Sequence, residues 1–173
     1  KTRAELTQAL EAGSGQFNIE LEEEGMVLGE LAQAMGKRAN AALRVNPDVD
    51  AGTHAKIATG MKENKFGVAI DRAPAIFARL AAQSGLAMRG IATHIGSQLF
   101  DLAPLEAAFG RIGDLVAQLR AAGHRIDRVD LGGGLGGPYR RDHVPPTPAD
   151  YGAMVVRATK GWGATLMFEP GRM

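Results

Sequence analysis

A run of five glycines in six positions could bind an anion. The run occupies residues 132–137, directly after a short apolar segment at Arg128–Leu131. Because glycines have no side chains, the backbone N–H groups of Gly132, Gly133 and Gly134 could converge on a phosphate. A tight turn that needs positive φ angles is the simpler explanation. Five glycines exceed what a turn requires, so we predict a phosphate-binding loop.

The same run also satisfies the pattern Gly-x-Gly-x-x-Gly, which occurs in dinucleotide-binding proteins but has many false matches. A dinucleotide site needs a helix that opens directly on the glycines and an acidic residue about 20 positions later. Here Pro138 follows the glycines and Arg157 occupies the later position. A nucleotide-binding module therefore stays only as an alternative.

A histidine and a serine follow a different apolar segment, in the sequence His-Ile-Gly-Ser-Gln at residues 94–98. His94 at the end of a strand would face a ligand, and Gly96 would permit its close approach. A lone histidine is more often structural. Because no second histidine lies at ligand spacing and the chain has no cysteine, no metal site is predicted.

A carboxylate and a guanidinium follow the last apolar segment, in the sequence Phe-Glu-Pro-Gly-Arg at residues 168–172. Glu169 in that position could keep a proton on the nitrogen of a ligand ring. The competing explanation is an ion pair at the surface between Glu169 and Arg172, which is common and contributes little stability.

The elements that must position these groups alternate between helix and strand. Helical periodicity favours helices at Thr2–Ala12, Glu22–Met35, Asp71–Gly85 with Asp71 as N-cap, and Pro104–Ala122. Apolar runs favour strands at Gln16–Glu20, Ala41–Asn46, Met88–Ile95, Arg128–Leu131 and Ala164–Glu169. The alternation predicts an α/β fold with parallel strands, in which functional residues gather at the carboxyl ends of the strands.

Composition excludes several classes of partner. The 20 Lys and Arg residues nearly balance the 19 Asp and Glu residues, so no strong field would attract nucleic acid. No apolar stretch reaches the roughly 18 residues of a membrane span, and no signal peptide is recognisable. We expect a cytoplasmic protein that binds a small molecule, without nucleic-acid or membrane partners.

The 173 residues fit one domain, but the two ends do not look like domain boundaries. The chain begins directly in an expected helix and ends four residues after Glu169. A complete (β/α)8 barrel needs roughly 250 residues, and we expect only five strands. Residues 1–173 are therefore predicted to be an incomplete barrel domain that lacks about three upstream strands.

The order of five motifs is more specific than any one of them. It resembles the alanine-racemase-like, fold type III pyridoxal-phosphate decarboxylases, and most closely the diaminopimelate decarboxylase family, over the whole chain. Residues 16–20 would then form the fourth barrel strand of eight. The motifs are Leu-Arg-Val-Asn-Pro-Asp (43–48), Thr-Gly-Met-Lys-Glu-Asn-Lys-Phe-Gly (59–67), His-Ile-Gly-Ser-Gln (94–98), Asp-Leu-Gly-Gly-Gly-Leu-Gly (130–136) and Glu-Pro-Gly-Arg (169–172).

The resemblance implies a site for pyridoxal 5'-phosphate in a (β/α)8 TIM barrel, of which this chain would contain strands four to eight. His94 and Glu169 would be the catalytic residues, stacked on the cofactor ring and paired with its nitrogen. Arg172 would contact phosphate or the substrate carboxylate. Arg44 would lie near the cofactor and Lys65 near a subunit interface. The implied cofactor-binding residues are His94, Ser97, Gly132, Gly133, Gly134, Glu169, Gly171 and Arg172.

The activity implied for a full-length homodimer is decarboxylation of meso-2,6-diaminopimelate to L-lysine and CO2, the last step of lysine biosynthesis. Ornithine, arginine or carboxynorspermidine decarboxylases, a racemase and a non-catalytic cofactor-binding protein remain alternatives. Leu21 stands where family members commonly have serine, and Ala92 and Thr93 replace the more usual residues before His94.

Two further parts of the family's active site are absent from the sequence. The family's cofactor-binding lysine lies in a motif like Ala-Val-Lys-Ala-Asn at the first barrel strand, and no such motif occurs here. The resemblance also implies a C-terminal β domain beyond residue 173. We therefore expect the chain alone to be inactive.

Overall fold

A parallel β-sheet organises the molecule, and its strands follow the order β1-β2-β4-β5-β6. The computed structural model describes residues 1–50, 66–138 and 144–171. β3 lies off this path and pairs in parallel with the end of β2. The strands are β1 (Phe17–Ile19), β2 (Ala39–Asn46), β3 (Val68–Ala69), β4 (Leu86–Ala92), β5 (Arg128–Asp130) and β6 (Thr165–Met167).

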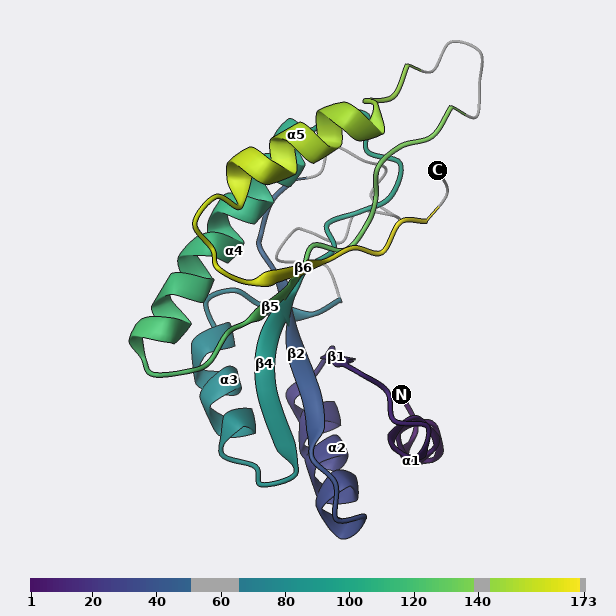
Figure 1. Ribbon diagram of the computed structural model, residues 1–173, viewed down its shortest axis with the longest axis vertical. Helices are drawn as coiled ribbons and strands as arrows, with labels where there is room; N and C mark the ends of the chain where they lie inside the picture. Colours follow the sequence, from purple (N-terminus) through teal and green to yellow (C-terminus); the bar gives the residue numbers. More distant parts are fainter. Residues whose placement is uncertain (51–65, 139–143, 172–173) are drawn as a thin grey trace.

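The helices alternate with these strands along the chain, and α3 and α4 run along one side of the sheet in Figure 1. Every pairing between neighbouring strands is parallel, as the alternation predicted. The helices of the described residues are α1 (Arg3–Glu11), α2 (Glu22–Ala34), α3 (Ala73–Ala81), α4 (Ala103–Ala121) and α5 (Pro148–Ala158).

The expected apolar positions form the core. In α4, Leu105, Phe109, Ile112, Val116 and Leu119 are all buried, which confirms the period read from the sequence. The two longest strands, β2 and β4, are buried along most of their length. Such continuous burial is typical of parallel strands that are covered on both faces.

Three details differ from the sequence expectation. Asp71 is not the N-cap of α3, because the helix begins at Ala73 and Arg72 occupies the cap without a side-chain hydrogen bond. The short strand β3 adds a sixth strand to the expected five, and its two residues pair with Val45 and Asn46. Two residues are too few for an alternation pattern to be visible.

The third difference is helix α5, which was not expected. Thr147 and Asp150 form a reciprocal capping box at its start, and Pro148 occupies the first turn. Met154 and Val155 are buried, whereas Arg157 pairs with Glu106 of α4 through its Nε at 3.0 Å. The capping signal was present in the sequence but was obscured by the adjacent prolines.

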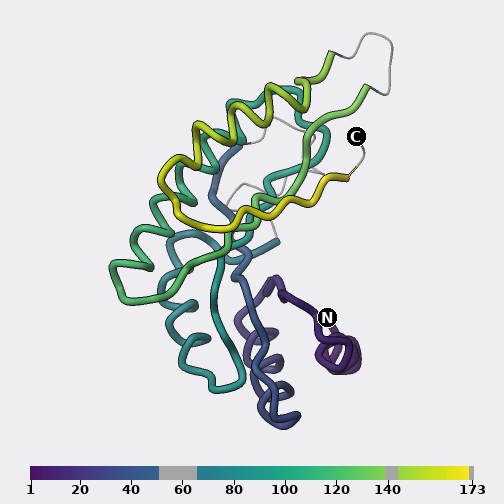
Figure 2. Tube along the Cα trace, in the orientation of Figure 1, coloured from purple at the N-terminus to yellow at the C-terminus, as the bar shows by residue number. Residues whose placement is uncertain are grey.

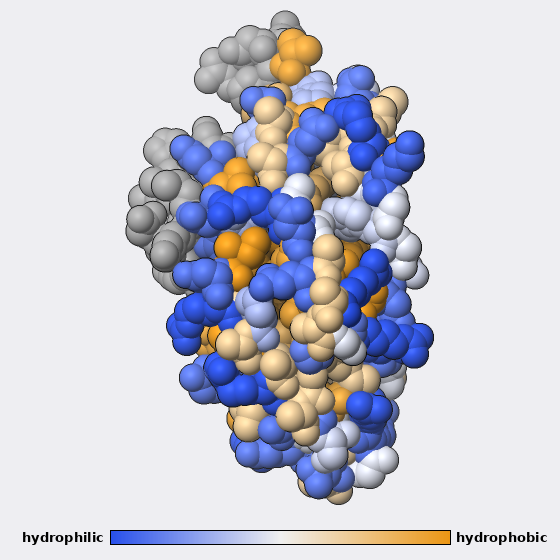
Figure 3. All heavy atoms as spheres, turned by 90° about the vertical axis from the view of Figure 1, so that its left-hand side faces the viewer, coloured by the Kyte–Doolittle hydropathy of each residue, from blue (hydrophilic) through white to orange (hydrophobic). Residues whose placement is uncertain are grey.

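The side of the molecule that carries the helices presents mainly hydrophilic side chains with small apolar areas between them (Figure 3). No helix in the described part of the chain combines the length and the apolar character that crossing a membrane requires. The opposite side of the sheet holds the polar groups described next.

Candidate functional site

The loops that follow β4, β5 and β6 lie side by side at the carboxyl edge of the sheet (Figure 2). The backbone N–H of Glu169, after β6, donates to the carbonyl oxygen of Gly132, after β5, at 2.8 Å. The N–H of Leu99, after β4, donates to the carbonyl oxygen of Gly134 at 2.9 Å. The glycine loop is therefore hydrogen-bonded on both sides, to the loop of His94 and to the loop of Glu169.

The contact with the glycine loop favours one protonation state of His94. The backbone N–H of Gly133 donates to Nδ1 of His94 at 3.2 Å. Because Nδ1 accepts this hydrogen bond, it cannot carry a proton. Burial, assisted by the positive charge of Arg44, lowers the pKa of His94 below its ordinary value. Both effects favour the neutral imidazole with its proton on Nε2.

The glycines allow the three loops to approach one another. A Cβ atom on Gly133 would lie 2.1 Å from the carbonyl oxygen of Glu169, and one on Gly134 would lie 2.2 Å from that of Gly96. Gly132 and Gly134 also adopt positive φ angles of 67° and 109°. Turn geometry and close loop contact thus both require glycine here. The predicted binding of phosphate stays a prediction.

A buried carboxylate lies beside Glu169. Asp130, at the end of β5, is only 3% exposed. Its Oδ1 accepts from the backbone N–H of Gly132 at 2.9 Å, and its Oδ2 accepts from Nδ2 of Asn18 at 2.8 Å. The same Nδ2 donates to Oε1 of Glu169 at 3.3 Å. One amide thus joins two carboxylates from β5 and from the segment after β6.

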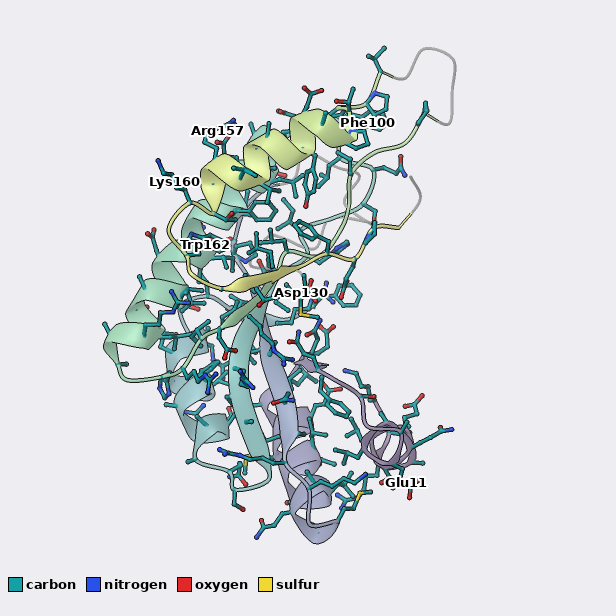
Figure 4. All side chains as sticks on the ribbon, in the orientation of Figure 1. Glu11, Phe100, Asp130, Arg157, Lys160 and Trp162 are labelled. Atoms are coloured by element: carbon teal, nitrogen blue, oxygen red, sulfur yellow. The ribbon has the colours of Figure 1, made fainter. Side chains whose placement is uncertain are left out.

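Burial is the main cause that raises the pKa of Glu169 above the ordinary glutamate value, and the charge of Asp130 adds to it. Figure 4 shows Asp130 on the side of the sheet away from α4 and α5, whose outer surface carries Arg157.

Arg44 supplies a positive charge to the described part of the site. It projects from β2, and its Nη1 donates to Oε1 of Glu20 at 2.7 Å. Its guanidinium carbon lies 5.6 Å from the ring centre of Phe66, within range of a cation–π contact. The second carboxylate oxygen of Glu20 is buried and has no hydrogen-bond partner among the described residues. Such an oxygen can accept a hydrogen bond from a ligand.

A cavity of about 340 Å³ opens between these loops, which lies within the size range of small-molecule sites. Its volume and its polar groups fit pyridoxal phosphate, since an aromatic imidazole, a hydroxyl and a carboxylate face the same space. A smaller cavity of about 40 Å³ adjoins the other side of the glycine loop, between that loop and Tyr151 and Phe168. The larger cavity is lined by His94, Ser97, Gln98, Gly134, Leu135, Glu169 and Gly171.

Sequence reasoning thus placed five of its site residues around the larger cavity, namely His94, Ser97, Gly134, Glu169 and Gly171. Gly132 and Gly133 line the smaller cavity. Arg172, Lys65 and the first seven residues of the motif at 59–67 lie outside the described residues. Within the described ranges, no group of three or more metal-binding side chains comes together.

Two residues of the site were missed as functional candidates. Asp130 was quoted only as part of a motif, and Asn18 only as part of a strand. The available signal was a polar side chain in a short apolar strand, since Asn18 lies between Phe17 and Ile19, and Asp130 between Val129 and Leu131. A polar residue in such a position needs a buried partner.

Comparison with known proteins identifies the family to which this chain is similar. The family model described as "Pyridoxal-dependent decarboxylase, pyridoxal binding domain" matches residues 1–173. A diaminopimelate decarboxylase of Zymomonas mobilis is 53% identical over 173 residues, which are 99% of this chain and 41% of that protein. One of Pseudomonas aeruginosa is 48% identical over 172 residues, with the same coverage of 99% and 41%. The chain thus spans about two fifths of these relatives' length.

Among solved structures, diaminopimelate decarboxylase of Helicobacter pylori complexed with L-lysine superposes with a TM-score of 0.94 at 34% identity. The match covers 99% of this chain and 43% of that one. The Chlorella virus arginine decarboxylase, at 24% identity and a TM-score of 0.77, shares the fold. The expected fold class, part of a pyridoxal-phosphate-binding (β/α)8 barrel, is confirmed.

Proposed function

This chain belongs to the pyridoxal-dependent decarboxylases, within their pyridoxal-binding domain, and we propose that the whole protein converts meso-2,6-diaminopimelate to L-lysine and CO2. Support for the substrate comes from the relatives, which are diaminopimelate decarboxylases at up to 53% identity among those compared. Two similar solved structures of that enzyme hold L-lysine, the product that this reaction would release.

The observation that most supports the proposal is the placement of His94, Gly134 of the glycine loop and Glu169 around one cavity. When bound, pyridoxal phosphate draws electrons away from the carbon that loses its carboxylate. The chain's own residues must bind the cofactor, orient it and keep its nitrogen protonated.

Each of these tasks has a candidate residue. The imidazole of His94, held by Gly133, would cover one face of the cofactor ring. Ser97 and the backbone N–H groups of the glycine loop would bind the phosphate, because hydroxyl and amide donors suit its oxygens. Glu169 would accept a hydrogen bond from the ring nitrogen and hold the proton there. A carboxylate preorganised in this way stabilises charge as it develops.

The lysine that links the cofactor would come from elsewhere in a protein of the relatives' length. None of the described residues that line the larger cavity is a lysine, and we propose that the cofactor-linking lysine lies on another barrel strand. Arg172, at the end of the motif that contains Glu169, would bind the phosphate or the substrate carboxylate. We further propose a cytoplasmic homodimer whose barrel is completed by strands outside residues 1–173.

The test is an assay of the full-length protein loaded with pyridoxal phosphate. We expect L-lysine and CO2 in equal amounts from meso-2,6-diaminopimelate, and little product from L-ornithine or L-arginine. The cofactor-free protein is the control and should be inactive until pyridoxal phosphate is restored. Preferential decarboxylation of ornithine or arginine would overturn the substrate, and failure to bind the cofactor would overturn the function.

A further inference from the structure

We propose that Asn18 is a positioning residue that holds the Glu169 carboxylate in place, and that Asp130 and Gln16 fix the orientation of its amide. The inference rests on the proposed function, because it concerns the carboxylate that would pair with the cofactor nitrogen. Asn18 itself does not line the cavity and would act through Glu169.

The amide of Asn18 is held at both of its ends. Nε2 of Gln16 donates to Oδ1 of Asn18 at 2.9 Å. Nδ2 of Asn18 donates to Asp130 at 2.8 Å and to Glu169 at 3.3 Å. A primary amide has two N–H donors on its nitrogen, so these two carboxylates use both of them. Rotating the amide by 180° would point its oxygen at two carboxylates and break all three hydrogen bonds.

Asp130 provides the rigid end of this chain of hydrogen bonds. It is buried, and its other oxygen is fixed by the backbone N–H of Gly132 at 2.9 Å. Glu169 is exposed and lies after the end of β6. Asn18 therefore connects the exposed carboxylate of Glu169 to the buried Asp130, whose position is fixed.

Asn18 also makes the close approach of two carboxylates tolerable. Asp130 and Glu169 would repel each other if both were ionised and no donor lay between them. Among the described residues, Arg44 is the cation that acts on Glu169, and it is already paired with Glu20. Removing the amide should thus push an ionised Glu169 away from Asp130, or leave Glu169 protonated and hydrogen-bonded to Asp130. In neither case would the Glu169 carboxylate accept a hydrogen bond from the ring nitrogen as before.

The first experiment compares Asn18→Leu with Asn40→Leu in the full-length protein. Asn40 is a matched control because it is the same residue type on the neighbouring strand β2, two residues before Ala42, which pairs with Asn18. No hydrogen bond among the described residues links Asn40 to Asp130 or Glu169. Loss of one hydrogen bond to a charged group corresponds to about a 10-fold to 100-fold effect. We expect kcat to fall by about that factor in Asn18→Leu, with KM nearly unchanged. Asn40→Leu should keep the wild-type kcat.

A spectroscopic measurement separates positioning from general damage to the fold. The absorbance of the bound cofactor, followed against pH, reports whether its ring nitrogen stays protonated. In Asn18→Leu the transition should occur at lower pH than in wild type, because a displaced Glu169 no longer holds that proton. An unchanged transition together with an unchanged kcat would overturn the inference.

Titrating Glu169 in the cofactor-free protein tests the role of Asn18 even if the proposed activity is wrong. The Glu169 carboxyl can be followed by carbon-13 NMR and assigned with Glu169→Gln. Since the hydrogen bond from Asn18 lowers the pKa of Glu169, we expect that pKa to rise in Asn18→Leu. If Asn18→Leu does not fold, Gln16→Met leaves both carboxylates intact and should shift the titration in the same direction. No shift in either variant would overturn the inference and leave the proposed function standing.

Discussion

The backbone N–H of Gly133 donates to Nδ1 of His94 at 3.2 Å and so links the loop after β5 to the loop after β4. Protonation of Nδ1 would replace this hydrogen bond with a clash between two N–H donors. The contact between the two loops thus requires the neutral imidazole. Acidification should therefore weaken both the geometry of the site and the stability of the fold.

Stability should therefore depend on the charge of His94. Its pKa is lowered in the folded protein by burial and by Arg44, so the unfolded chain binds a proton more readily. The contribution of His94 is complete above the unfolded pKa and is lost as the pH falls from there through the folded pKa. In urea titrations, the free energy of unfolding should fall less between about pH 8 and about pH 5.5 in His94→Gln than in wild type. Equal losses in the two proteins would contradict the argument.

Arg44 should control the titration of His94. Its positive charge lowers the pKa of His94, so Arg44→Gln should raise that pKa, as measured from the imidazole proton resonances by NMR. The control is Arg79→Gln, which removes an exposed arginine paired with Glu22 on the outer helices and should leave the His94 titration unchanged. A shift of equal size in both variants would mean that the overall charge, and not the nearby guanidinium, is responsible.

Glu169→Gln should separate catalysis from cofactor binding. The substitution keeps the shape but removes the negative charge, so turnover should fall by about 100-fold to 1,000-fold, a loss typical of a preorganised electrostatic group. The dissociation constant for pyridoxal phosphate, measured by fluorescence, should change much less because the phosphate contacts remain. Near-normal turnover would rule out the proposed role of Glu169.

The same variant should stabilise the cofactor-free protein at neutral pH. Because the pKa of Glu169 is raised in the folded state, its contribution to stability is complete below the unfolded pKa and is lost as the pH rises through the folded pKa. Glu169→Gln removes the loss of stability that accompanies ionisation of Glu169, because glutamine does not ionise. Its free energy of unfolding should exceed that of wild type at neutral pH, and the difference should disappear in acid.

Gly134→Ala should destabilise the protein, because its Cβ would lie 2.2 Å from the carbonyl oxygen of Gly96 and its φ angle is 109°. We expect a loss of at least about 2 kcal/mol in the free energy of unfolding, together with weaker cofactor binding. Gly152→Ala is the matched control, since a Cβ atom on this helical glycine in α5 would have nothing within 4 Å. It should stabilise the protein by about 0.5–1 kcal/mol. Similar losses in both variants would contradict the steric argument.

The amino-acid sequence by itself determined the parallel α/β arrangement, because helix and strand periods are local and their alternation restricts the topology. It also pointed to His94, Ser97, Glu169 and the glycine loop, since residues that follow parallel strands gather at one edge. Motif order then sufficed to indicate the family. Short or proline-rich segments such as β3 and the start of α5 were missed, because their local pattern is weak.

Only the tertiary structure decided how the site is held together. Asn18 meets Asp130 and Glu169 across 112 and 151 residues of sequence. β1 and β6 stand at opposite ends of the strand order, so their side chains meet only because the sheet curls. No spacing along the chain encodes that curvature, which arises from the twist of parallel strands packed under helices. The polar support of Glu169 is a property of the folded sheet.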